Sequence, residues 1–315
     1  MSRVTVTLAP GSSVRQDRIS SLAEVLRSRQ MNSGGWAYFG SAQESIEATC
    51  LAALALGPEA GTNRRGAISL LLRSQLGDGS WPAFRGDSDG SWTTALAVCT
   101  LNLTGDFAAA RDKAIGWLIA ERGREGQYLW RWKFKTVDCN VQFDPDKYGW
   151  PWSPGTASWV LPTAFSVVAL KQFTACNRSE VSEKRIRLGV EMLLDRACVG
   201  GGWNAGNGVV YGTPLRPHAE ATAIALLALQ DESYSPVIRG ALDWLKARSM
   251  TIRSAESLAW CILSLFVYRQ PVEQLKEALA RKARESIENE NTAALATTIL
   301  ALKCGEMIHP FEVLR

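Results

Sequence analysis

The chain has 315 residues, of which 46% are hydrophobic and 21% are charged, and its formal net charge is +4. This composition supports a large buried core and excludes intrinsic disorder. Basic and acidic residues alternate without forming blocks, so nucleic-acid binding gains no support. No apolar run approaches the ~20 residues of a membrane-spanning helix, and we expect no secretory signal in the polar residues 1–18.

The cysteines and histidines argue against a metal centre. Seven cysteines are scattered along the chain without any CxxC pair, and the only histidines are His218 and His309. We therefore expect reduced thiols in a cytoplasmic protein and neither a metal site nor another cofactor.

Taken in chain order, the sequence alternates two kinds of helical segment. The first kind is amphipathic, with charged residues on one face, and covers residues 16–30, 65–75, 109–122, 184–196, 237–248 and 272–284. The second kind is rich in Ala and Thr and apolar on every side, at residues 45–56, 91–101, 156–170, 218–229, 255–265 and 292–302. A helix that is apolar on every side must be buried on every side.

This alternation predicts an all-α fold, an (α/α)6 barrel with six inner and six outer helices. We expect one domain over residues 1–315, with residues 1–15 as an N-terminal extension. Open solenoids need polar capping repeats, whereas the last repeat here is as apolar as the first. A closed ring is therefore favoured, with the N-termini of the inner helices at a common end.

The links from outer to inner helices carry a repeated pattern. Residues 30–36 and 75–81 both read Q-x3-G-x-W, while residues 122–128 and 197–203 are weaker copies that end in Tyr128 and Trp203. Gly permits a left-handed helix cap, Gln can bond a neighbouring helix terminus, and Trp can cover that terminus. The pattern resembles the QW motif of squalene–hopene and oxidosqualene cyclases over about residues 16–302. The resemblance implies a terpene-cyclase toroid that these motifs hold together.

The same resemblance points to candidate acids. Class II cyclases of this family protonate an alkene or epoxide with the middle Asp of D-x-D-D-T-A, at the start of an inner helix. In that register the first repeat places Glu47 at the acid position, and the fourth places Glu220 there, with His218 two residues before it. The fifth repeat offers Glu256, whereas the second and third have Trp92 and Leu161. The flanking aspartates are missing, and a first-turn Glu also suits helix capping, so both interpretations stay open.

Two further regions are candidates. Asp87 and Asp89 lie in a Gly-flanked stretch that suits either a capped turn or an acid or diphosphate contact. The long connector, residues 126–156, suits either a cation-stabilising lining or a packed flap over one mouth of the ring. Its four tryptophans, together with two tryptophans and a histidine near the inner helices, form the candidate substrate-binding set. The set is Trp92, Trp130, Trp132, Trp150, Trp152, Trp159 and His218.

Two functions of different class follow. The first is a class II terpene cyclase-like enzyme of isoprenoid biosynthesis, an isomerase or lyase that cyclises a linear isoprenoid or meroterpenoid in an aromatic-lined cavity. The alternative is a non-catalytic toroid that binds a hydrophobic ligand or a protein partner. In either case we expect an isoprenoid-type small molecule as partner and leave room for peripheral membrane contact. A zinc-dependent prenyltransferase ranks third, because neither histidine occupies the matching inner-helix position.

Overall fold

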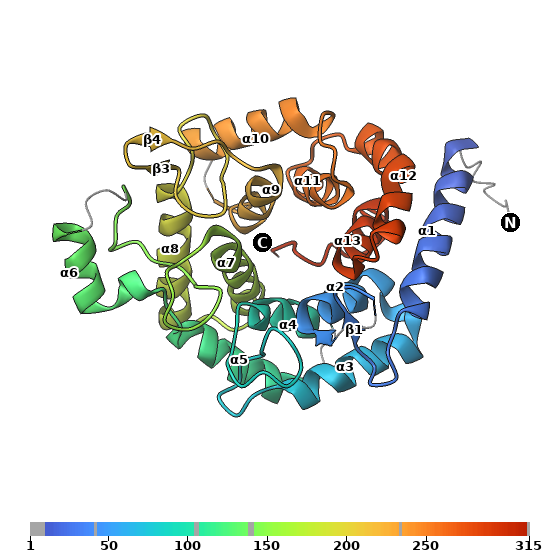
Figure 1. Ribbon diagram of the computed structural model, residues 1–315, viewed down its shortest axis with the longest axis horizontal. Coiled ribbons are helices and arrows are strands. Elements are labelled where there is room, and N and C mark those ends of the chain that lie inside the picture. The colour runs from blue at the N-terminus through green and yellow to red at the C-terminus, as the bar shows by residue number, and fades with distance from the viewer. Residues whose placement is uncertain (1–9, 41–42, 104–106, 138–141, 233–234, 314–315) are drawn as a thin grey trace, which may run out of the picture.

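The inner ring is built from the helices that are apolar on every side. The computed structural model describes residues 10–40, 43–103, 107–137, 142–232 and 235–313. The inner helices are α2 (Ile46–Leu56), α4 (Thr93–Asn102), α7 (Val160–Thr174), α9 (Ala219–Ala228), α11 (Ala255–Val267) and α13 (Thr292–Leu302). Each packs on the next, and α13 returns to pack on α2, so the ring is closed (Figure 1).

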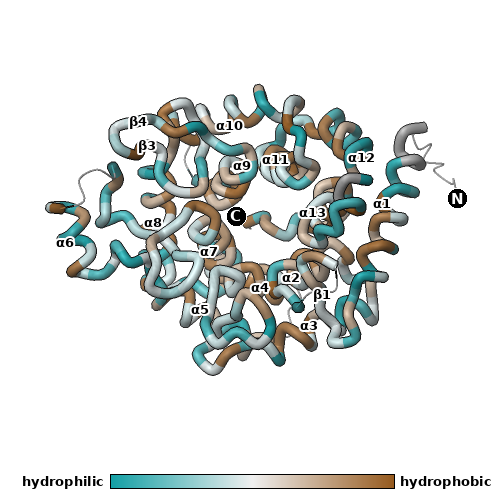
Figure 2. The backbone as a smooth tube through the Cα atoms, in the orientation of Figure 1, coloured by the Kyte–Doolittle hydropathy of each residue, from teal (hydrophilic) through white to brown (hydrophobic). Residues whose placement is uncertain are grey.

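The amphipathic helices form the outer ring. They are α1 (Pro10–Ser28), α3 (Thr62–Ser74), α5 (Ala108–Ala120), α8 (Glu180–Asp195), α10 (Pro236–Ser249) and α12 (Glu273–Glu288). Hydrophobic residues concentrate on the inner helices and hydrophilic ones on the outside (Figure 2). The predicted all-α toroid is confirmed. The expected N-terminal extension is shorter than residues 1–15, because α1 already begins at Pro10.

Side-chain caps begin several inner helices. Ser45, Ser254 and Asn291 each accept a hydrogen bond from the backbone N–H three residues further on. Such a cap contributes about 1 kcal/mol because it satisfies an otherwise unpaired donor of the first turn. The caps fix the first turns of α2, α11 and α13.

A buried tryptophan joins the outer and inner helices in four repeats. Its indole N–H donates to a leucine carbonyl near the end of the preceding outer helix, at 2.6–2.7 Å. Its backbone N–H donates to a threonine hydroxyl of the next inner helix, at 2.9–3.1 Å. The four pairs are Trp36 with Thr49, Trp81 with Thr94, Trp150 with Thr163, and Trp203 with Thr222. These bonds explain why the links hold the two rings together.

The third link departs from the sequence prediction. Tyr128, expected at the tryptophan position, is 80% exposed, and Trp150 makes the bonds instead. The intervening chain forms the short helices η2 (Arg124–Gly126) and α6 (Tyr128–Thr136). In Figure 1, α6 lies outside the ring, beyond α8. The first half of the connector is therefore an outward insertion, not a flap over a mouth of the ring.

Two small hairpins complete the described chain. β1 (Trp36–Ala37) pairs antiparallel with β2 (Glu44–Ser45), and β3 (Val209–Val210) pairs antiparallel with β4 (Thr213–Pro214). Cys139 lies outside the described residues, and the six described cysteines are free thiols. None of the described helices is both long and apolar enough to cross a bilayer.

Lysines tie together the C-terminal ends of the inner helices. Lys171 of α7 donates to the Ala228 carbonyl of α9 at 3.0 Å, and Lys303, at the end of α13, donates to the Ala55 carbonyl of α2 at 3.2 Å. The last carbonyls of a helix lack intrahelical donors and carry a partial negative charge. A lysine ammonium group there donates hydrogen bonds to them and offsets the charge.

The C-terminal segment closes this end of the ring, and the chain terminus lies at its centre in Figure 1. Gln172 and Gln230 donate to backbone carbonyls of the segment, including that of Phe311 at 2.9 Å. His309 contacts the Leu263 carbonyl at 3.2 Å. Phe311 is fully buried. We call residues 308–313 the tail.

Candidate functional site at the N-terminal rim

The first turns of the inner helices bring three glutamates together. Glu47, Glu220 and Glu256 each occupy the second position of their helix, on α2, α9 and α11. α13 lies between α2 and α11 and has the small Ala293 at the corresponding position. We call the three carboxyl groups the acidic rim. Glu47 and Glu220 were candidates from the sequence pattern, and Glu256 joins them.

The three carboxyl groups interact electrostatically. Partial burial raises the pKa of Glu47 to about 8, and the charges of Glu256 and Glu220 contribute to the rise. Burial likewise raises the pKa of Glu256 to about 7, with a further contribution from Glu220. Burial alone raises the pKa of Glu220. A carboxyl group leaving water and facing like charges holds its proton more tightly.

Tyr38 lies beside the acidic rim. Burial raises the pKa of its hydroxyl, and the charge of Glu47 adds most to this among its neighbours. The Asn291 side chain bonds the same hydroxyl and acts in the opposite direction. No described cation contributes to the pKa of any rim glutamate. Glu47 therefore stays mostly protonated near neutral pH, whereas Glu256, with a pKa of about 7, is partly ionised there.

Aromatic rings continue from the rim into the centre of the ring. Trp92 is the N-cap residue of α4 and stands two residues before Thr94, as Glu47 stands two before Thr49 on α2. Its ring meets Trp152 edge-on at 5.2 Å. Trp92 also contacts Phe165 at 5.6 Å, and Phe165 contacts the buried Trp260 at 5.6 Å. Phe311 of the tail packs against Trp260 at 5.4 Å. Half-buried rings near the rim thus lead to a closed aromatic floor.

Trp159 and His218 lie in a neighbouring groove. They line a groove of about 430 Å³ with Asn204 and Arg216, between the starts of α7 and α9. The Trp159 side chain is 37% exposed, and His218 is exposed. Both residues remain available to a ligand, although the structure does not place them among the rim carboxyl groups.

Trp150 is a correction to the predicted substrate-binding set. It is 1% exposed, its indole bonds the Leu118 carbonyl, and the Arg185 guanidinium stacks on its ring at 3.3 Å. Arg185 is itself held by the Gly149 carbonyl at 2.7 Å. Trp150 therefore packs between outer and inner helices and has no free face for a substrate.

The remaining candidates lie away from the rim. Trp130 and Trp132 belong to α6, which lies outside the ring in Figure 1 and not over its mouth. Asp87 and Asp89 lie in an exposed turn, where Asp87 accepts a bond from the Phe84 N–H at 3.3 Å. That geometry fits the capped-turn interpretation. Exposed carboxylates in a solvated turn lack the apolar surroundings that a proton donor needs.

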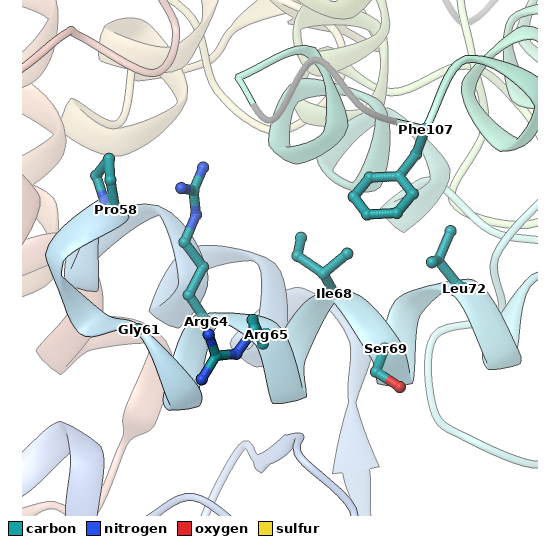
Figure 3. A pocket seen from close by; sticks show the side chains of 8 residues that line it. All are labelled: Pro58, Gly61, Arg64, Arg65, Ile68, Ser69, Leu72 and Phe107. Atoms are coloured by element: carbon teal, nitrogen blue, oxygen red, sulfur yellow. The ribbon is translucent and has the colours of Figure 1, made fainter.

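The outer wall carries a separate groove of about 490 Å³. Figure 3 shows Arg64, Ile68 and Leu72 of α3 facing Phe107 across it, with Pro58 at one end. Among the described residues its lining consists of two arginines, Ser69 and apolar groups, without a carboxyl, thiol or imidazole group. The groove can hold a ligand, but its described lining offers no carboxylic acid, so the acidic rim is the candidate site for acid catalysis.

Comparison with known proteins supports the fold. No family model and no curated relative match the sequence. Among solved structures, the type II terpene cyclase MstE from Scytonema matches with a TM-score of 0.60 at 17% identity, over 92% of this chain and 98% of that chain. The fold is a terpene-cyclase-like toroid. One MstE structure holds the substrate geranylgeranyl dihydroxybenzoate.

Other solved structures share the fold, and one of them is named for a different activity. The endo-1,4-D-glucanase from Vibrio fischeri ES114 matches with a TM-score of 0.61 at 11% identity, over 93% of this chain and 98% of that chain. A protein from Actinoplanes matches with a TM-score of 0.61 at 15% identity, over 93% and 100% of the two chains. Identities this low show the fold alone, so function must be argued from the site.

Proposed function

We propose that the chain is a class II terpene cyclase-like enzyme that cyclises a linear isoprenoid or meroterpenoid by protonation. Glu47 is the proton donor, and Glu220 and Glu256 keep it protonated through their proximity. The observation that carries the proposal is the acidic rim itself, where Glu47 has a pKa of about 8. A group protonated at neutral pH can act as a general acid.

The surroundings of Glu47 suit the later steps. Trp92 and Trp152 present half-buried rings beside the rim, and aromatic faces attract a developing carbocation. The first turn of α2 stabilises the carboxylate that remains after proton transfer. A carboxylic acid with a raised pKa is a weak acid, and an epoxide oxygen accepts its proton more readily than an alkene carbon does. The proposal therefore favours substrates with a terminal epoxide.

A second candidate is hydrolysis of a glycosidic bond. It is favoured by the presence of several carboxyl groups with raised pKa values in one rim, since glycosidases use a protonated carboxylic acid with a second carboxylate. The toroid neighbours include glycosidases. The third alternative is a toroid that binds a hydrophobic ligand or a protein partner without chemistry.

The test is incubation with linear polyprenyl substrates of about 15 to 30 carbons, bearing a terminal alkene or epoxide, followed by mass spectrometry. We expect an isomeric cyclic product and a loss of about 10²–10⁴-fold in turnover for Glu47→Gln, because the amide keeps the shape but has no acidic proton. Glu220→Gln and Glu256→Gln should lower turnover less.

Asp87→Asn is the matched control and should retain full turnover. Full turnover by Glu47→Gln and by Glu220→Gln would show that the acid lies elsewhere. Release of sugar from an oligosaccharide panel, without any isomerised polyprenyl product, would favour the glycosidase candidate. Saturable binding of polyprenyl compounds without turnover would favour the binding protein.

A further inference from the structure

The tail fills the centre of the ring from the C-terminal end of the inner helices, as Figure 1 shows. The centroid of the Phe311 ring lies 5.4 Å from that of Trp260 on α11 and 5.8 Å from that of Phe165 on α7. Phe165 and Trp260 also contact each other, at 5.6 Å. One side chain of the tail therefore supports two inner-helix rings from below.

Exposure to solvent falls in steps from the rim to the tail. Trp92 and Trp152 are half-buried, Phe165 and Trp260 are each 3% exposed, and Phe311 is fully buried. The part of the interior that solvent reaches from the rim therefore ends at the rings of Phe165 and Trp260.

This floor lies close beneath the carboxyl groups. Glu256 is the second residue of α11 and Trp260 is the sixth, so their backbone atoms are separated by about 6 Å along the helix axis. Phe165 is likewise the sixth residue of α7. A ligand that enters from the rim meets the floor after about one helical turn.

The tail is held through its main chain. Gln172 donates to the Pro310 carbonyl at 2.9 Å, and Gln230 donates to the Phe311 carbonyl at the same distance. The Phe311 N–H donates to Nδ1 of His309 at 3.2 Å. None of these bonds involves the Phe311 side chain. A substitution of Phe311 therefore leaves these anchors in place and changes what lies beneath the two rings.

We propose that Phe311 determines the length of the hydrocarbon chain that the ring accepts. The inference rests on the proposed function, because it needs a linear isoprenoid that enters from the rim. The Phe311 ring blocks movement of Phe165 and Trp260 toward the tail, since a close-packed interior yields little. A smaller side chain lets both rings settle toward the tail and deepens the interior. Phe311 is thus a positioning residue that acts through the two rings a chain would touch.

The test compares two saturated alcohols that differ by one isoprene unit, hexahydrofarnesol and phytanol. They contain no double bond, so tryptophan fluorescence gives their Kd values without any turnover. In Phe311→Ala we expect the ratio of the two Kd values to change about tenfold in favour of phytanol, the effect of a small change in an apolar pocket. Phe311→Leu should shift the ratio less and in the same direction, and it decides the question if Phe311→Ala does not fold.

The matched control is Phe266→Leu. Phe266 stacks on His309 of the tail at 6.2 Å, and its described ring contacts include neither Phe165 nor Trp260. This variant should loosen the tail and leave the ratio unchanged. An equal shift in the control would assign the effect to the whole tail and overturn the proposal. An unchanged ratio in folded Phe311 variants, or no binding of either alcohol, would overturn it as well.

Turnover separates this inference from the proposed function. Cyclisation of farnesyl and geranylgeranyl epoxides with the same length preference in all variants would overturn the inference and support the proposed function. A shifted Kd ratio without any cyclisation would support the inference and count against the proposed function.

Discussion

The two ends of the inner ring differ in the sign of their charged side chains and in how these side chains are paired. At the C-terminal end, Lys171 and Lys303 have carbonyl and carboxylate partners. At the N-terminal end, Glu47 and Glu256 face each other, and no described cation affects their pKa values. Lysines near helix C-termini and glutamates near helix N-termini both agree with the helix dipole. Only the lysines, however, have described partners of opposite charge. The C-terminal end is built for stability, whereas the rim retains an electrostatic strain that suits chemistry.

The largest effect should come from the tryptophans beneath the rim. Trp81→Ala removes a fully buried ring and its bond to the Leu71 carbonyl, so we expect a loss of about 3–5 kcal/mol in the free energy of unfolding. Glu47→Gln should cost at most ~1 kcal/mol. Denaturant titration of both variants measures the difference. A Trp81→Ala protein of normal stability that has lost its function would mean that this residue serves the ligand.

Next in size is the lysine network of the opposite end. Lys171→Met leaves the Ala228 carbonyl without its lysine donor and removes the ion pair with Asp231, so we expect a loss of about 1–3 kcal/mol in the free energy of unfolding. Lys246→Met is the control, because Lys246 forms an exposed pair with Asp243 within one helix. Equal stabilities of the two variants in thermal unfolding would remove the contrast between the ends.

The two ends should also respond to pH with opposite signs. The folded pKa of Glu47 is raised to about 8, so its contribution to stability is complete below its unfolded pKa and is lost as pH rises toward 8. Burial lowers the pKa of His309 to about 4, so its contribution is complete above its unfolded pKa and is lost as pH falls toward 4.

Thermal unfolding midpoints measured between about pH 4 and pH 8 give the pH dependence that each group contributes to stability. Glu47→Gln should flatten the loss of stability as pH rises from about 4.5 toward 8, and His309→Gln should flatten the loss as pH falls from about 6.5 toward 4. If neither variant changes its own side of the profile, these two groups do not govern the pH response.

The smallest effect should follow changes in the turn before α4. Asp87→Asn and Asp89→Asn alter exposed side chains, so we expect changes within about 0.5 kcal/mol and unaltered turnover. Loss of turnover in either variant, with the fold intact by circular dichroism, would move the proton donor from the rim to this turn.

The ring could be predicted from the sequence because its signals are local and repeated. The indole of Trp36, Trp81 or Trp203 bonds a carbonyl ten residues earlier, so the spacing is visible in the sequence. In the third repeat the corresponding separation is 32 residues, because α6 is inserted, and Tyr128 took the place of Trp150 in the prediction. An insertion breaks the period without changing the fold.

The candidate site was only partly predictable, because its members come from different repeats. Glu256 shares with Glu47 a Ser two residues before it, and this local signal was present. That α11 faces α2 across Ala293 follows from ring closure and not from any single repeat. The tail gave no signal, since His309 and Phe311 lie in a short stretch without periodicity.

The seam between α2 and α13 has a kinetic consequence. Lys303 bonds the Ala55 carbonyl across 248 positions of the chain. Closing a loop of this length costs about 5 kcal/mol in chain entropy by the (3/2)RT ln n relation, roughly 1.5 kcal/mol more than joining successive inner helices about 45 residues apart. We therefore expect local helix pairs to form first and the seam to form last. Because Glu47 lies on one side of the seam and Glu256 on the other, closing the ring brings these two carboxyl groups together and adds to the rise in the pKa of Glu47 that burial causes.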